Sequence, residues 1–226
     1  MIRSAQHFAL RVWLRAWTTT PRLAAIGIAN VLPLELVILE RGLRWRRKNS
    51  SELFVPLAQI KYLSYCGVPA STICGNTDMK GLVADVFDRS WSDCSDSVRA
   101  FLPRPKLMTG LKNNRRYETT WFITNHGPFL TYLNRFHKNR FLSDLCPECA
   151  VPQTSLHCLY HCGLFDSERE QLVQEVLAHG LRWTEALTEM LLFVPLIDAF
   201  NTFCATVCGR LMIMNQTVGT VASVSD

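Results

Sequence analysis

Cysteine and histidine residues crowd into one short run of this chain, and that run most restricts what the chain can fold into. It begins with Cys146-Pro-Glu-Cys149, then has His157 after seven residues and Cys162 after four more. A C-x2-C turn places two thiolates on one side of a tight loop, and a His and a Cys about one helical turn apart can complete a tetrahedral Zn²⁺ site. Four protein ligands leave no open position for catalysis, so the sequence predicts one structural Zn²⁺ in a CCHC zinc knuckle.

The second half of this motif leaves alternatives open. His157 and His161 are four positions apart and would share a helix face, so His161 could replace Cys162 as the fourth ligand. Cys158 adds a third candidate. A further alternative is that these residues are buried thiols without a metal. The spacing favours Cys162.

Cysteine usage also bears on the cellular compartment. The nine cysteines are an odd number, and His7, Arg11 and Arg15 interrupt any apolar run near the N-terminus. We therefore expect reduced thiols or metal ligands, and a protein that is not secreted. The lack of acidic residues before Glu35 resembles a mitochondrial presequence, but Pro21 interrupts the basic face and makes targeting the less favoured interpretation.

Apolar periodicity and capping signals predict an all-α fold with the zinc knuckle inserted between helices. Ser4 is expected to cap the first helix, with Phe8, Val12 and Leu14 facing inward. The predicted helices cover residues 5–17, 21–30, 33–48, 51–65, 83–101, 117–138 with a joint at 125–128, 167–179 and 195–212, followed by a frayed tail after 216.

This pattern divides the chain into five predicted regions. They are an N-terminal helical region (1–66), a linker with a central helix (67–116), a basic and aromatic helical segment (117–143), the zinc knuckle (144–166) and the C-terminal helices (167–226).

Positive charge is concentrated in two blocks. Residues 1–50 hold nine Lys and Arg against two acids, and residues 101–143 hold eight against one acid. Basic blocks in a near-neutral chain favour contact with a polyanion, although a solvated helix face is the alternative. In the second block most aromatic side chains, including Phe129 and Phe136, are expected to pack in the core. The residues predicted to bind nucleic acid are Arg115, Arg116, Arg135, Lys138 and Arg140.

The most apolar stretch of the chain, residues 191–209, is long enough to span a bilayer. Pro195, Asp198 and Asn201 interrupt it, and a charge at mid-bilayer costs at least about 2.5 kcal/mol. A buried C-terminal helix, without membrane contact, is therefore predicted.

Two segments resemble the region that follows the polymerase in Jockey-type non-LTR retrotransposon reverse transcriptases. Residues 123–170 are similar to that family's long ordered motif, and residues 6–36 to an earlier one. The long motif is matched by Thr124, His126, Gly127, Phe129, Tyr132, Leu133, Arg135, Phe136, Cys146, Cys149, Thr154, His157, Cys162, Phe165, Arg169 and Leu172.

This resemblance implies an accessory role in target-primed reverse transcription, with RNA or DNA and other parts of a retrotransposon polyprotein as partners. It also implies a nuclear or cytoplasmic ribonucleoprotein location. The polymerase motif Tyr-x-Asp-Asp does not occur in the chain, so we do not expect an enzyme by itself. The alternative is an inert or co-opted relic that acts, if at all, as a helical protein-interaction module.

The chain departs from the family pattern at several positions. Asn30 and Asn125 stand where the family has glycine, and Asn is the least costly replacement if the backbone there has positive φ. Thr18 replaces an arginine, which removes one basic contact. The section between the two motifs is barely recognisable, which favours the relic alternative.

Overall fold

The computed structural model describes residues 2–29, 31–49, 78–103 and 116–221. Every regular element in these ranges is a helix, and the isolated bridge between Leu145 and Pro152 is the sole pairing of extended backbone among them. The predicted all-α class is therefore confirmed. The helix predicted over residues 51–65 lies outside the described residues.

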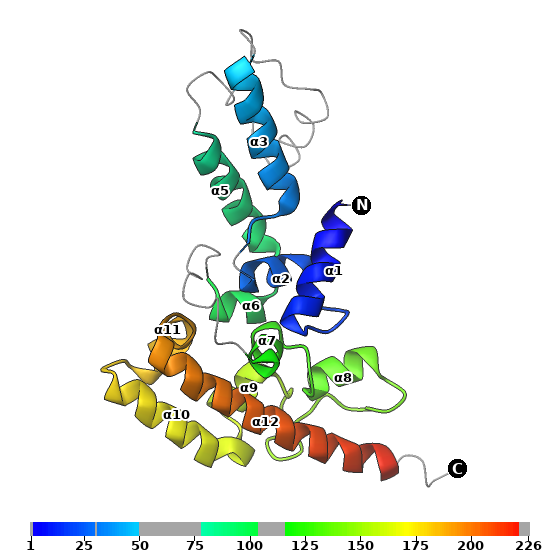
Figure 1. Ribbon diagram of the computed structural model, residues 1–226. Helices are drawn as coiled ribbons and strands as arrows, with labels where there is room; N and C mark the ends of the chain where they lie inside the picture. The colour runs from blue at the N-terminus through cyan, green and yellow to red at the C-terminus, as the bar shows by residue number, and fades with distance from the viewer. Residues whose placement is uncertain (1, 30, 50–77, 104–115, 222–226) are drawn as a thin grey trace.

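Short helices make up most of the chain, and one long helix ends it (Figure 1). In order they are α1 (Ile2–Leu14), α2 (Arg22–Ile28), α3 (Leu34–Asn49), α5 (Met79–Ser90), η2 (Trp91–Asp93), α6 (Asp96–Phe101), α7 (Tyr117–Thr124), α8 (Leu130–Phe136), α9 (Ser155–Tyr160), η5 (Gly163–Phe165), α10 (Asp166–Ala178), η6 (Trp183–Glu185), α11 (Ala186–Leu192) and α12 (Val194–Val221).

Helix α1 corrects two predictions about the N-terminal segment. It ends at Leu14, before the predicted end at residue 17, because Arg15 takes a left-handed conformation with φ 48°. Leu14 is buried as predicted, but Phe8 and Val12 are 62% and 64% exposed. Helix α1 contacts α2 and α3 at the edge of the molecule, so much of its circumference faces away from the core (Figure 1).

The helix predicted over residues 83–101 is interrupted. Helix α5 begins at Met79 and gives way to η2 at Trp91, and the chain becomes helical again at Asp96. The Trp91 ring is buried, its indole N–H donates to the Leu102 carbonyl at 2.8 Å, and a Cβ on Gly27 would meet the ring at 2.1 Å. The interruption thus places Trp91 against α2. Helical periodicity does not predict this long-range contact.

The predicted joint between residues 125 and 128 is confirmed. Helix α7 ends at Thr124, Asn125 is its left-handed C-cap with φ 52°, and α8 begins at Leu130. Asn125 therefore meets the condition under which Asn is the least costly replacement for glycine. Asn30, the other position where the family has glycine, lies outside the described residues.

Helix α12 crosses the C-terminal half of the molecule and packs against α7, α10 and α11 (Figure 1). It continues to Val221, past the predicted end at residue 212 and into the predicted frayed tail. One reason is a hydrogen bond beyond the predicted end of the helix, in which the Asn215 amide donates to the Pro128 carbonyl at 2.7 Å. By length and composition, Val194–Gln216 could also cross a membrane, and half of its most apolar window is buried. The absence of membrane contact stays a prediction.

The larger of two hydrophobic clusters among the described residues runs from Leu14 in α1 to Leu211 in α12, and the smaller one consists of Leu130, Tyr132, Leu133 and Phe141. At the centre of the larger cluster Phe122 packs edge-on against Phe129, Phe200 and Phe203, which joins α7 to α12. The five predicted regions therefore share a core, and their boundaries stay predictions.

Candidate metal centre and basic surface

The loop around Cys146 and Cys149 is a tight turn closed by backbone hydrogen bonds. The Ala150 N–H donates to the Cys146 carbonyl at 2.9 Å, and the Cys146 N–H donates to the Val151 carbonyl at 2.7 Å. Ala150 has φ 54°, the left-handed conformation that reverses the chain after the second cysteine. Backbone hydrogen bonds alone are enough to form this turn and to position the thiols of Cys146 and Cys149.

Helix α9 supplies the other half of the cluster. The Thr154 hydroxyl caps α9 by accepting the His157 N–H at 3.0 Å. After α9 ends, the Cys162 N–H donates to the His157 carbonyl at 2.9 Å, which turns Cys162 back beside the helix. A capped single turn of helix followed by this reversal brings His157 and Cys162 to the same side.

The structure brings all four predicted metal ligands together. The thiol sulfurs of Cys146, Cys149 and Cys162 and a ring nitrogen of His157 all lie within 4.8 Å of one another, so the cluster could hold a metal ion. The Sγ atoms of Cys146 and Cys162 are 3.6 Å apart. Two sulfurs bound tetrahedrally at about 2.3 Å would be about 3.8 Å apart. The cysteines that the structure describes are all free thiols.

An unsatisfied histidine supports the fit of a metal to this cluster. Nε2 of His157 is buried and has no hydrogen-bond partner. Burial, with the charges of His161 and Arg169, lowers the pKa of His157, so its ring is neutral near pH 7. A neutral imidazole is the form that binds metals.

The two facing thiols differ in how readily they ionise. Burial raises the pKa of Cys146, but hydrogen bonds from the backbone N–H groups of Cys149 and Glu148 outweigh it, so the net pKa is lowered. Burial dominates at Cys162 and raises its pKa to about 12. One thiolate is therefore stabilised by the loop itself, whereas the second needs a nearby cation.

The alternative ligands lie outside the cluster. His161 is exposed beside the Tyr160 ring, and the four grouped ligand atoms do not include it. Cys158 is fully buried, and burial raises the pKa of its thiol far above the usual range. The geometry thus favours Cys162 over both.

Arg169 in α10 donates hydrogen bonds to the segment that contains His157 and Cys162. Its guanidinium donates to the carbonyls of Leu159, at 2.8 Å, and of Cys162, and it also pairs with Asp166. The Leu159 carbonyl is in the last turn of α9, whose carbonyls have no partner within the helix, and the Cys162 carbonyl follows that helix. The spacing of the ligands did not predict that Arg169 would bond these carbonyls, although Arg169 belongs to the motif matched in the family resemblance.

Gln153 links the segment after the Cys146–Cys149 turn to α8. The sequence analysis did not predict this connection. Its side-chain oxygen accepts the Leu130 N–H at 3.2 Å, and its backbone carbonyl accepts the Thr131 N–H and hydroxyl at 3.4 and 3.0 Å. Its side chain also contributes to the lowered pKa of the Cys146 thiol. The first turn of α8 is thereby attached to the segment that joins the two halves of the cluster.

Three of the predicted nucleic-acid-binding residues cluster where α8 ends. Arg135 is in the last turn of α8, Lys138 and Arg140 follow it, and all three are exposed. Phe136 was predicted to be core but is 41% exposed, with the Arg135 guanidinium 5.3 Å from its ring centre. Helix α8 is short and ends the buried face at Leu133, so Phe136 shares the surface with the cations.

Arg116 lies on another part of the surface. Its backbone N–H donates to Asn201 Oδ1 at 3.4 Å, whereas Arg140 lies beside Asn215. Asn201 and Asn215 are separated along α12 by about 20 Å at 1.5 Å per residue. Arg115 lies outside the described residues.

Comparisons of the chain with protein-family models, with curated proteins and with solved structures found no match.

Proposed function

We propose that this chain is a nucleic-acid-binding accessory segment of a retrotransposon-derived reverse transcriptase, with one structural zinc ion and no catalytic site of its own. The observation that carries the proposal is the hydrogen-bonded connection, through Gln153, between the segment that joins the two halves of the Cys/His cluster and the first turn of α8, a helix whose other end is basic. The family resemblance supplies the biological setting.

Zinc is the metal that best suits the donor set. Three thiols and one imidazole are soft and borderline ligands, which favour Zn²⁺ over the oxygen-binding cations Mg²⁺ and Ca²⁺. When bound, zinc supplies a cross-link between the Cys146 turn and α9. Gln153 and Arg169 then hold α8 and the end of α9 against that cross-linked unit.

The basic end of α8 is suited to a phosphate backbone. Arg135, Lys138 and Arg140 are exposed within one short stretch, and the Phe136 ring lies beside them. Cations bind phosphates mainly by releasing counterions, so affinity should fall steeply with salt. Exposed aromatic rings add stacking surface for unpaired bases.

The test is fluorescence anisotropy with labelled single-stranded RNA and DNA at several salt concentrations. Arg135→Gln/Lys138→Gln should weaken binding and reduce the slope of log affinity against log salt by about 1.4, at about 0.7 per cation. The matched control is Lys80→Gln/Arg99→Gln, which removes the same charge from exposed positions on α5 and α6. Affinity that depends neither on salt nor on Arg135 and Lys138 would overturn the proposal.

The exposed apolar side chains of α1 and α3 favour a second candidate, a helical protein-interaction module. Phe8, Val12 and Trp13 on α1 are 62%, 64% and 59% exposed, and Trp45 on α3 is 66% exposed. Apolar patches of this kind are typical of protein contacts. Metal-loaded protein that binds no nucleic acid, but whose self-association or partner binding is lost in Trp13→Ser, would favour this candidate.

A further inference from the structure

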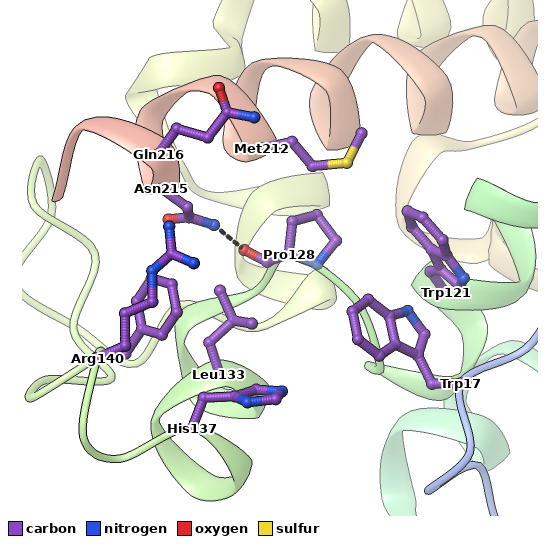
Figure 2. A pocket seen from close by; sticks show the side chains of 10 residues that line it. Trp17, Trp121, Pro128, Leu133, His137, Arg140, Met212, Asn215 and Gln216 are labelled. Atoms are coloured by element: carbon purple, nitrogen blue, oxygen red, sulfur yellow. Dashed lines mark hydrogen bonds between the residues drawn. The ribbon is translucent and has the colours of Figure 1, made fainter. Parts of the chain in front are cut away.

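A pocket of about 340 Å³ opens between α8 and the C-terminal part of α12, beside the basic residues (Figure 2). Two indole rings, Trp17 and Trp121, form one wall, and Met212 of α12 lies across from them. Arg140 and Asn215 lie on the side of the pocket away from the tryptophans. The pocket therefore combines an aromatic wall with a cationic edge.

Contacts with neighbouring residues fix the two indole rings of the aromatic wall in place. The rings of Trp17 and Trp121 have centroids 5.8 Å apart, and Trp17 also packs edge-on against Tyr132 at 5.1 Å. The Trp121 indole N–H donates to the Arg15 carbonyl at 3.3 Å. Because these contacts fix the rings without a ligand, the wall is a preformed stacking surface.

The cationic edge is also fixed. The Arg140 guanidinium lies 5.5 Å from the centre of the Phe141 ring, and the Asn215 amide donates to the Pro128 carbonyl, the bond drawn in Figure 2. Arg135 and Lys138 are exposed nearby in sequence, at the end of α8. A strand whose phosphates bind these cations would pass the mouth of the pocket.

We infer that this pocket takes one unpaired base of a single-stranded nucleic acid, stacked against Trp17 or Trp121 while Arg140 contacts its phosphate. This inference rests on the proposed function and names the part of the nucleic acid that the site recognises. The volume is at the low end of the range of about 300–1,000 Å³ for small-molecule sites, which suits one planar ring system. Aromatic walls stack bases of any sequence, and the cations complement the charge of the backbone.

The experiment compares two probes of equal charge, a twelve-nucleotide oligo(dT) and an abasic oligomer of the same length. Full-length, metal-loaded protein should bind oligo(dT) at least about fivefold more tightly, because one stacked base contributes at least about that factor. Met212→Trp should fill the pocket and lower this ratio clearly below the wild-type value. Met212 is 39% exposed, so the change need not disturb the core.

The matched control is Ile213→Trp, which adds the same ring to the next residue of α12, 66% exposed and not part of the pocket lining. It should keep the wild-type ratio, and circular dichroism and metal content should show both variants folded. A folded Met212→Trp protein that keeps the wild-type preference would overturn the base pocket and leave the proposed function standing.

Two further results are informative. Wild-type protein that binds both oligomers equally would also overturn the base pocket, and would favour an apolar side chain of a protein partner as the occupant. Wild-type protein that binds neither these oligomers nor single-stranded RNA would overturn the proposed function together with this inference.

Discussion

The side-chain oxygen of Asn125 accepts a hydrogen bond from the Ser155 N–H at 2.7 Å, which joins the end of α7 to the start of α9. The amide nitrogen of Asn125 donates to the Thr131 hydroxyl at 3.3 Å, in the first turn of α8. Asn125 therefore does more than tolerate its left-handed backbone. It connects the three short helices α7, α8 and α9.

Replacing Asn125 with glycine separates these two roles. Asn125→Gly relieves the left-handed strain but leaves the Ser155 N–H without its partner, which costs about 1–3 kcal/mol. We expect a net loss of about 1 kcal/mol in the free energy of unfolding, measured by urea denaturation of the metal-loaded protein. Asn125→Asp keeps the acceptor and should lose less. A glycine variant as stable as wild type would contradict the connecting role.

The four-ligand set predicts which substitutions remove the metal. Cys149→Ser should reduce the zinc content from one ion per chain to none, because three donors and a hydroxyl bind zinc far more weakly. The measurement is elemental analysis after exhaustive dialysis. His161→Ala is the control, since this exposed ring lies outside the cluster, and the variant should keep its zinc. Loss of zinc in His161→Ala would show that the ligand set is different.

Arg169 should affect metal affinity without being a ligand. In Arg169→Lys a single ammonium cannot reach the carbonyls of both Leu159 and Cys162 that the guanidinium spans. Loss of such outer contacts typically lowers metal affinity about 10- to 100-fold. Competition with a chromophoric chelator would measure the change. Arg99→Lys, at an exposed ion pair on α6, should leave the metal affinity unaltered.

Cys94 predicts an alkaline limit to stability. Burial raises the pKa of its thiol to about 12 from the ordinary value of 9.0. Below pH 9 the thiol is protonated in both states, so it adds no pH dependence. Between pH 9 and 12 the unfolded chain loses this proton and the folded chain keeps it, so stability falls by up to about 1.4 kcal/mol per pH unit.

The check is urea unfolding of wild type and Cys94→Ala at pH 8 and pH 10.5. The alanine variant should lose less stability between the two pH values, because it has no thiol to ionise. Equal losses in the two proteins would show that Cys94 does not govern this pH range.

Local patterns in the sequence determined the helical class, the α7–α8 joint and the four members of the Cys/His cluster. Cys146 and Cys162 are close along the chain, so a turn and a capped helix suffice to bring them together. The left-handed backbone at Asn125 is likewise a property of a helix end. These features depend on residues a few positions apart, and spacing and capping rules describe such interactions directly.

Only the tertiary structure decided which apolar residues are buried and which surfaces meet. Helical periodicity placed Phe8 and Phe136 inside, but both side chains are exposed in the part of the chain that the structure describes. Trp17 and Trp121 lie far apart in sequence, yet their rings form one wall of the same pocket. Packing between distant segments depends on how the helices are arranged around the common core, and no local spacing encodes that arrangement.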